Sequence, residues 1–269
     1  MPREGTGPDF IEALARGLEV IESFGAYPRE MSLSDVAAQT GLARPTARRI
    51  LLTLEELGYV RPCPGGYALT PRVLGLGMAY VQSFGLWDIA RPHMERLVAR
   101  TGESTSIAQL DGSDIIYVAR VAVPKIVALV VQIGTRFPAL QTSLGKVLLA
   151  AQDDDEVAQI LAEPTRSGLT PRWDPDPAER RKELRTVRAQ GWALTDEQLA
   201  RGIRSIAAPL REGSGRVVAA INVNCHAAET SVEHLLNHHL PLLLQTAGAI
   251  SADFSRIGDL PHSREPAAS

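Results

Sequence analysis

Residues 41–61 read GLARPTARRILLTLEELGYVR, and this stretch decides how the first quarter of the chain folds. Its apolar residues recur at helical spacing and share one face of the expected helix, namely Ala47, Ile50, Leu51, Leu54 and Leu57. The opposite face carries basic residues near the N-terminal end, namely Arg44, Arg48 and Arg49, together with Pro45. The helix dipole disfavours cations at that end, so a polyanion in contact with it would offset the cost.

A second helix is expected immediately before this one, in the segment MSLSDVAAQTG. Ser32 is a good N-cap, Asp35 stands three residues later as the acid of a capping box, and Gly41 is a typical helix stop. Pro45 fits the first position of the following helix, where its missing N–H costs nothing. Two helices joined by a short glycine turn, the second with a basic N-terminal end, have helix-turn-helix spacing.

The residues that follow, YVRPCPGGYAL, predict a β-hairpin that serves as a wing. Short β-runs at 59–61 and 67–69 flank a Pro-Gly-Gly turn. Turn, helix and hairpin together favour DNA binding over the alternative, a plain helical pair with a solvated arginine face. The candidate DNA contacts are Arg44, Pro45, Thr46, Arg48, Arg49 and Arg61.

Bulk composition neither requires nor excludes this interpretation. The chain has 269 residues, 45% of them hydrophobic, and a net charge of -3, which is typical of a globular protein with one large or two ordinary domains. Residues 1–72 hold eight Lys/Arg and nine Asp/Glu, so any DNA footprint is a local patch. No signal peptide or membrane-spanning run is visible, and the expected compartment is the cytoplasm. Cys63 and Cys225 form no Cys-x-x-Cys pair, so a disulfide framework or structural zinc site is not expected.

The remaining chain predicts a connecting helix and then an α+β domain with an antiparallel sheet. An amphipathic helix is also expected at the start of the chain, over 9–24, and the connecting helix over 71–84. Strands are expected at 103–110, 114–121, 125–133, 192–196, 202–210 and 216–225. Helices are expected at 87–102, 142–152, 153–163, 178–191 and 231–255.

Signatures of enzyme and metal sites are weak. There is no Gly-x-Ser-x-Gly, His-Glu-x-x-His or complete Gly-x-Gly-x-x-Gly, and residues 144–147 lack the glycine and hydroxyl of a phosphate loop. Cys225 and His226 are adjacent on a strand, so their side chains point to opposite faces. The acid run at 153–156 is better explained as helix capping than as a metal site. His234 and His238 could ligate a metal, but a surface pair is favoured. We therefore expect no catalytic residue, metal or cofactor.

One strand suggests a small-molecule cavity. In RVVAAINVNC, Val218, Ala220, Asn222 and Asn224 share one face, which either is solvated or lines a cavity with two amides. Thr142 is a candidate N-cap, which would leave the N–H groups of 143–145 free to hold a carboxylate, and Gly145 would allow close approach. Sequence alone leaves these two alternatives open.

Taken together, these stretches resemble the IclR-type bacterial transcription regulators over nearly the whole chain. The pieces that carry the resemblance are SLSDVAAQTGLARPTARRILLTLEELGYV, GTRFPALQTSLGKVLLA, GWALTDEQLARGIRSIAAPL and INVNCHAAETSVEHLL with LLQTAGAISADF. The last segment is most similar to the branch that regulates catabolism of protocatechuate, 4-hydroxybenzoate and β-ketoadipate. The resemblance implies a winged helix-turn-helix at 1–70, a linker helix at 71–85 and a GAF-like effector domain at 86–257. The polar, Pro-containing composition of 258–269 predicts a disordered tail.

The resemblance also implies an effector site and partners. Matched residue by residue, the ligand contacts would be Ser143, Leu144, Asp196, Ser205, Asn222 and Asn224, to which the sequence adds Gly145 and Arg136. Arg136 could instead form a structural salt bridge. The expected partners are double-stranded operator DNA, a small carboxylic acid (protocatechuate, 4-hydroxybenzoate or β-ketoadipate) and further copies of the chain, as a dimer or tetramer, with apolar stripes at 10–24 and 74–81 as contacts. The alternative is an enzyme that uses the GAF-like cavity and a winged helix for protein contacts.

Overall fold

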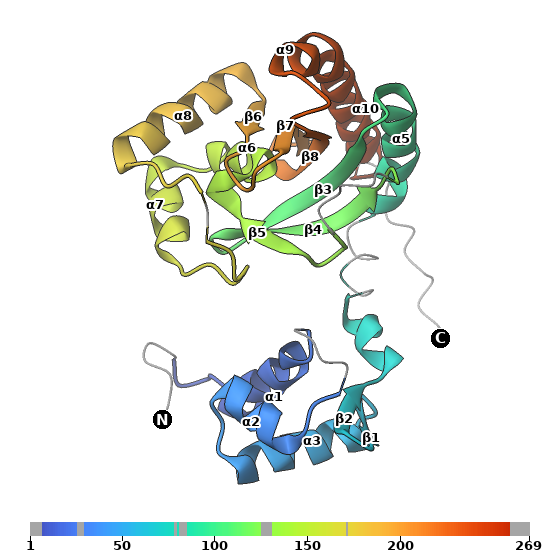
Figure 1. Ribbon diagram of the computed structural model, residues 1–269, viewed down its shortest axis with the longest axis vertical. Helices are drawn as coiled ribbons and strands as arrows, with labels where there is room; N and C mark the ends of the chain where they lie inside the picture. Colours follow the sequence, from blue (N-terminus) through green and yellow to red (C-terminus); the bar gives the residue numbers. More distant parts are fainter. Residues whose placement is uncertain are drawn as a thin grey trace, which may run out of the picture. The chain divides into compact units, whose positions relative to one another are not determined.

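The computed structural model describes residues 7–25, 30–77, 80, 85–124, 131–170 and 172–258. The chain divides into two compact units, Met1–Ser83 and Phe84–Ser269 (Figure 1). Most of the strand predicted at 125–133 and nearly all of the predicted tail lie outside the described residues. Of the helices in the described ranges, none combines the length and the apolar character needed to cross a membrane.

The N-terminal unit confirms the predicted helix-turn-helix and hairpin. Its elements are α1 (Glu12–Ser23), α2 (Leu33–Thr40), α3 (Arg44–Glu56), β1 (Val60–Cys63) and β2 (Gly66–Leu69). The capping box forms as expected, because the Asp35 N–H donates to Ser32 Oγ at 3.2 Å and the Ser32 N–H donates to Asp35 Oδ2 at 3.0 Å. Helix α3 begins at Arg44, so Pro45 occupies its second position rather than its first.

The hairpin is held against the start of α2 by one extra bridge. Met31 and Tyr67 exchange backbone hydrogen bonds of 2.9 Å in both directions. Gly66 has a φ of 133°, and a Cβ there would collide with the carbonyl oxygen of Met31. Glycine is therefore required for the wing to close on the helical core.

The predicted connecting helix is described only in part. A 3-10 turn, η1 (Pro71–Val73), leads into helical residues at 74–77 and at Tyr80. The other residues of the predicted helix lie outside the described ranges.

The C-terminal unit is the expected α+β fold, built on a six-stranded antiparallel sheet of order β5-β4-β3-β8-β7-β6. Its strands are β3 (Ser104–Asp111), β4 (Asp114–Val121), β5 (Arg136–Pro138), β6 (Ala193–Asp196), β7 (Ile203–Arg211) and β8 (Val217–His226). Strand β5 was not predicted, and residues 131–133 are not in a strand.

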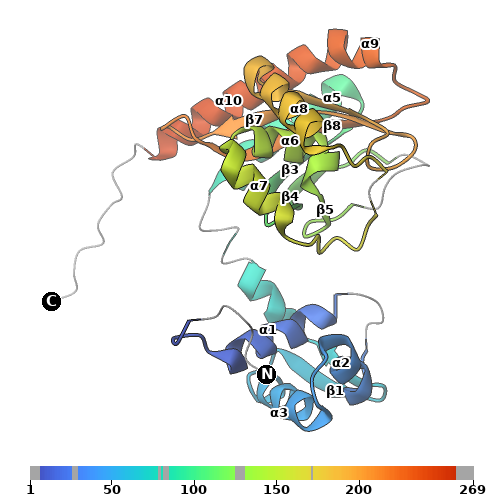
Figure 2. The ribbon, with the colours of Figure 1, turned by 90° about the vertical axis from the view of Figure 1, so that its left-hand side faces the viewer.

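Helices cover both faces of this sheet. They are α5 (Leu86–Thr101), α6 (Ser143–Ala150), α7 (Asp154–Ala162), α8 (Pro177–Gln190), α9 (Val232–His234) and α10 (Leu240–Gly258), with the 3-10 turn η2 (Ala139–Gln141) before α6. Helices α5 and α10 pack together on one side, and α6, backed by α8, packs on the other (Figures 1 and 2). All eight residues of α6 are buried, so its N-terminal end lies inside the unit.

The predicted closing helix at 231–255 is interrupted. Between α9 and α10 the chain forms a π-helical turn, η3 (Leu235–His239). Pro241 lacks an N–H and its ring clashes with the carbonyl four residues earlier, so the helix cannot continue regularly through this point. A π turn absorbs such a defect and rotates the side chains that it carries.

Candidate functional site

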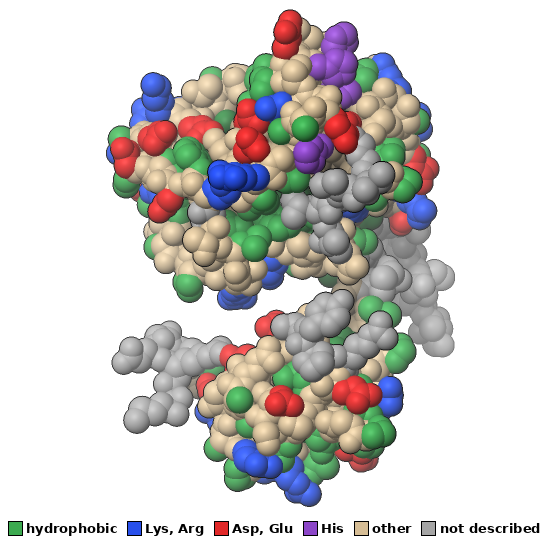
Figure 3. All heavy atoms as spheres, in the orientation of Figure 1, with side chains coloured by type: hydrophobic (Ala, Val, Ile, Leu, Met, Phe, Trp, Pro, Cys, Tyr) green, Lys and Arg blue, Asp and Glu red, His purple; other side chains and the backbone are tan. Residues whose placement is uncertain are grey.

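The basic side chains predicted to contact DNA are exposed on the N-terminal unit. Arg44, Pro45, Arg48, Arg49 and Arg61 are all exposed, and Thr46 is half-buried. Figure 3 shows Lys and Arg side chains gathered at the edge of this unit where α3 lies in Figure 1. The apolar face of α3 packs inward through Ala47, Leu51 and Leu54, which fixes the basic face outward.

An apolar groove of about 700 Å³ runs between α1 and α3. Leu14 and Leu18 on α1, Leu57 after α3 and Leu76 beyond the wing line it, each 48% exposed or more. Thr46 and Arg49 also line this groove. The structure therefore separates these two predicted DNA contacts from Arg44 and Arg48, which do not line it.

In the C-terminal unit, residues from the sheet and from the start of α6 enclose a small cavity. Its volume is about 20 Å³, the space of about one water molecule. Five of the predicted effector contacts line it, namely Ser143, Leu144, Ser205, Asn222 and Asn224. The polar face of β8 is thus covered at Asn222, so the alternative of a fully solvated face is excluded.

Asn222 is the centre of a buried hydrogen-bond network in this cavity. Its Oδ1 accepts from the Ser106 N–H at 2.9 Å, and its Nδ2 donates to Ser205 Oγ at 3.2 Å. Ser205 Oγ in turn lies 2.7 Å from Ser143 Oγ, a hydrogen bond in which either hydroxyl can donate. Each buried side chain finds a partner, as buried polar groups must.

The start of α6 offers two backbone donors to this cavity. Thr142 is the N-cap as predicted, but its side chain accepts from the Gly145 N–H at 3.0 Å, so that amide is already paired. The first two helical residues, Ser143 and Leu144, have no intrahelical acceptor for their N–H groups. A Cβ at Gly145 would collide with the backbone of Ala139, so this glycine serves close packing rather than ligand approach.

Besides Gly145, two predicted effector contacts lie outside the cavity lining, because other residues hold them. The Asp196 carboxylate accepts two hydrogen bonds from Arg204, one from Nε at 2.8 Å and one from Nη2 at 3.0 Å. Arg136 is ion-paired with Asp111 and lies 4.0 Å from Asp114. Of the two roles considered for Arg136, the geometry supports the structural salt bridge.

A different arginine lies on the cavity side of the sheet. Strand register pairs Arg120 with Ser106, and Ser106 with Asn222, so all three side chains project from one face. Arg120 donates to Ser106 Oγ at 3.0 Å, and burial lowers its pKa. No carboxylate among the described residues forms an ion pair with Arg120. Only the alternation of DIIYVARV could have indicated this position from sequence.

Tyr117 is a second cavity residue that sequence analysis missed. It lines the cavity and packs edge-to-face on Phe137, with ring centroids 5.6 Å apart. Burial raises the pKa of Tyr117 to about 12, with a small opposing effect of Arg120. Its phenol is therefore neutral at physiological pH and can both donate and accept a hydrogen bond.

Lys146 anchors α6 to α8. It is fully buried, ion-paired with Glu183 of α8, and its ammonium lies 4.4 Å from the centroid of the Trp173 ring. Burial lowers its pKa, and the ion pair with Glu183 partly offsets that effect. Lys146, which belongs to the incomplete phosphate-loop motif at 144–147, thus holds α6 against α8.

A winged helix-turn-helix joined in one chain to an α+β unit with a buried polar cavity defines a ligand-sensing DNA-binding regulator. The C-terminal domain of bacterial IclR transcriptional regulators matches residues 78–252, and the IclR helix-turn-helix domain matches residues 13–64. The chain therefore belongs to the IclR family of bacterial transcriptional regulators, and not to a family of enzymes.

Two members of the family and one solved structure show which proteins this chain is similar to. The Pca regulon regulatory protein of Pseudomonas putida is 39% identical over 238 residues, covering 88% of this chain and 82% of that protein. The p-hydroxybenzoate hydroxylase transcriptional activator of Acinetobacter baylyi is 32% identical, covering 90% and 91%. The crystal structure of an IclR homolog complexed with 4-hydroxybenzoate, from Microbacterium hydrocarbonoxydans, has a TM-score of 0.77 at 26% identity, covering 91% and 99%.

The buried phenol of Tyr117 predicts a loss of stability at alkaline pH. Between pH 10 and 12 the folded state retains a proton that the unfolded state releases, so stability present below pH 10 is lost as the pH rises. The loss should reach about 1.4 kcal/mol per pH unit within this window. Chemical unfolding of the parent and of Tyr117→Phe, at intervals from pH 8 upward, measures it. A difference between the two proteins that stays constant above pH 10 would contradict the assignment.

Proposed function

We propose that this protein regulates genes for the catabolism of aromatic acids, with α3 contacting operator DNA and the polar cavity of the C-terminal unit binding a small aromatic carboxylate. The observation that carries the proposal is the buried network of Ser143, Ser205 and Asn222 at the N-terminal end of α6. It offers several hydrogen-bond donors to one small volume in a buried region.

On the DNA side, Arg44 and Arg48 are the proposed major-groove contacts. Both are exposed on the N-terminal part of α3 and outside the apolar groove. Arginine is the side chain that most often reads guanine through two hydrogen bonds. Arg61 stands on the wing, where it can reach a phosphate. Pro45 and Thr46 would lie near the backbone, and Arg49 at the margin of the footprint.

Replacing the arginines that are proposed to enter the DNA major groove should weaken operator binding. Arg44→Ala and Arg48→Ala should each cost about 1–3 kcal/mol if the side chain contacts a base, and Arg61→Ala should reduce the salt slope of binding by about one. DNA selected from random sequence by the parent protein supplies the operator, and titrations at matched salt give the affinities. Arg91→Ala, an exposed arginine of the other unit, is the control. Parent-like affinity of both α3 variants would remove α3 from the interface.

The groove between α1 and α3 supports assembly through the N-terminal unit. Its exposed leucines continue onto Leu74 and Leu76 beyond the wing, which are 70% and 48% exposed. One winged helix reads few bases, and a two-fold dimer doubles the site. A second copy of the chain is therefore the proposed occupant of these apolar stripes, and higher assembly to a tetramer is compatible with it.

Placing a charge in the groove should therefore weaken the dimer. Leu14→Glu buries a carboxylate in the proposed interface, so light scattering at micromolar concentration should show more monomer than in the parent. Leu169→Glu introduces the same charge at a leucine of the other unit that is 43% exposed, and should leave the assembly unchanged. A parent that is monomeric with and without DNA would contradict the proposal, as would a Leu14→Glu protein that assembles like the parent.

In the effector cavity, we place the carboxylate on the N–H groups of Ser143 and Leu144. The helix dipole favours an anion there, and the Asn222 Nδ2 and the Ser143 hydroxyl can turn to donate to it. Arg120, on the same sheet face, replaces Arg136 as the nearest candidate cation. Tyr117 and Asn224 remain to bind the far end of the ligand. A protocatechuate or 4-hydroxybenzoate hydroxyl suits these two groups.

The cavity must open for such a ligand to enter. Ligand pockets typically enclose several hundred Å³, whereas this one holds about one water molecule. The hydroxyls of Ser143 and Ser205, now 2.7 Å apart, fill the space that a carboxylate would take. Ligand binding thus exchanges hydrogen bonds within the network for hydrogen bonds to the acid.

A thermal-shift screen tests the effector class. At 100 times its dissociation constant an acid should stabilise the fold by about 2.7 kcal/mol and raise the melting temperature. Asn222→Leu should abolish the shift, and Asn237→Leu, the same change at an exposed residue, should not. Protocatechuate, 4-hydroxybenzoate and β-ketoadipate are the ligands. No shift for any of them in the parent would exclude this effector class, and equal shifts in all three proteins would remove Asn222 from the site.

A further inference from the structure

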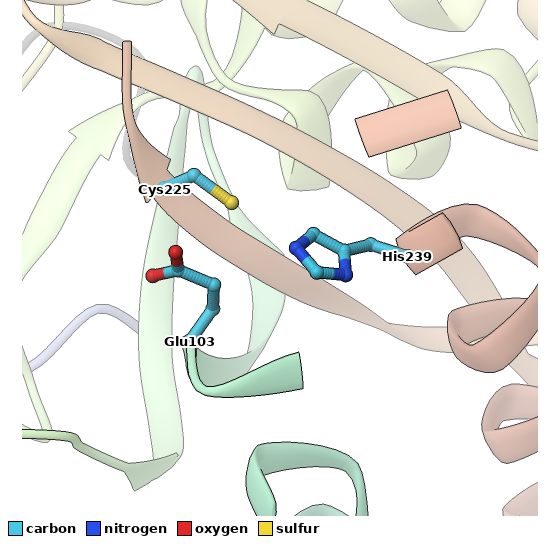
Figure 4. A group of neighbouring side chains, drawn as sticks. All are labelled: Glu103, Cys225 and His239. Atoms are coloured by element: carbon cyan, nitrogen blue, oxygen red, sulfur yellow. The ribbon is translucent and has the colours of Figure 1, made fainter. Parts of the chain in front are cut away.

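Three side chains of different chemistry meet in the C-terminal unit on the side of β8 away from the effector cavity. Glu103 follows the end of α5, Cys225 lies on β8, and His239 ends the π turn η3. Figure 4 shows all three pointing into a shared space. All are buried, and the thiol sulfur, one imidazole nitrogen and one carboxylate oxygen lie within 4.8 Å of one another.

Strand alternation makes this a second site, separate from the effector cavity. Asn222 and Asn224 line the cavity, and Cys225 is the next residue along β8, so its side chain points to the opposite face. The region it enters is covered by the C-terminal helices and by the loop that carries Thr230.

The donor set is the one that zinc uses. Thiolate sulfur, imidazole nitrogen and carboxylate oxygen are all common zinc ligands, at distances of about 2.0–2.3 Å. Small rotations of side chains within 4.8 Å of one another can bring three such atoms around one ion. Metal binding releases the thiol proton, and the resulting thiolate and the carboxylate together offset the charge of a divalent cation.

Neighbouring residues orient the Glu103 carboxylate and offer a path for a metal ion from the surface to the cluster. Thr230 Oγ1 donates to Glu103 Oε1 at 3.3 Å, which orients the carboxylate as an outer-shell partner does. The exposed imidazole of His234 contacts the rings of both His238 and His239, with centroid distances of 4.5 and 4.9 Å. The π turn before Pro241 therefore carries a path of imidazoles from the surface to the buried cluster.

We propose that Glu103, Cys225 and His239 bind one Zn²⁺ ion per chain, with a water molecule in the fourth position. The site does not depend on the effector proposal. It would tie the end of α5, strand β8 and the π turn η3 together.

Cobalt(II) tests the site directly because a cobalt–thiolate bond has a strong near-ultraviolet charge-transfer band. The chain has two cysteines, so Cys63→Ala leaves Cys225 as the only thiol. One equivalent of Co²⁺ added to the metal-free Cys63→Ala protein should produce the band, and Zn²⁺ should then remove it. Absence of the band in this folded protein overturns the proposal without any substitution in the cluster itself.

Calorimetric titration with Zn²⁺ separates the buried cluster from the surface histidines. The parent should bind one equivalent, Cys225→Ala in the same assay should lose that binding, and Thr230→Val should weaken it by about 10–100-fold. The double variant His234→Ala, His238→Ala should still bind one equivalent of Zn²⁺, but the metal should enter the buried site more slowly. Zinc binding that survives Cys225→Ala and disappears in the histidine double variant would place the metal on the surface and overturn the proposal. Melting curves confirm that each variant is folded.

Discussion

The C-terminal unit depends on one interaction, the hydrogen bonds that Asn222 makes in the middle of its sheet. One side-chain amide bridges β3, through the Ser106 N–H, and β7, through Ser205 Oγ. These groups are buried beneath α6, so losing one partner would cost about 1–3 kcal/mol for each buried polar group left unpaired. The amide therefore fixes how three neighbouring strands and the start of α6 meet.

That constraint explains why a sensing site can form in a packed core. Ser143 reaches the network from the first turn of α6, while Lys146, one turn on, fixes the same helix to α8 through Glu183. The helix is thus held firmly against α8, while Ser143 on its first turn contacts a hydroxyl that can exchange hydrogen-bond partners. In the proposed binding mode an incoming carboxylate competes with Ser205 for the same donors, which would couple ligand binding to local packing.

The sequence predicted the local elements well, because caps, glycine stops and apolar periodicity act over a few residues. Ser32 with Asp35, Gly41 and the apolar face of α3 all behave as expected. Prediction failed for the residues whose position depends on how distant strands pair in the sheet. Asp196 could not be excluded from the cavity without knowing that β6 pairs it opposite Arg204, and Arg120 could not be included without the register of β4 against β3. The predicted helix at 231–255 overlooked Pro241, and its sequence could not indicate the burial of His239 in the π turn.

The central claim is that an aromatic carboxylate replaces the hydroxyl contact between Ser143 and Ser205, and a crystal structure of the protein with 4-hydroxybenzoate tests it most directly. We expect the carboxylate within about 3.2 Å of the Ser143 or Leu144 nitrogen and of Asn222 Nδ2, with the two serine hydroxyls moved apart. A ligand bound elsewhere, with Ser143 Oγ and Ser205 Oγ still 2.7 Å apart, would contradict the account.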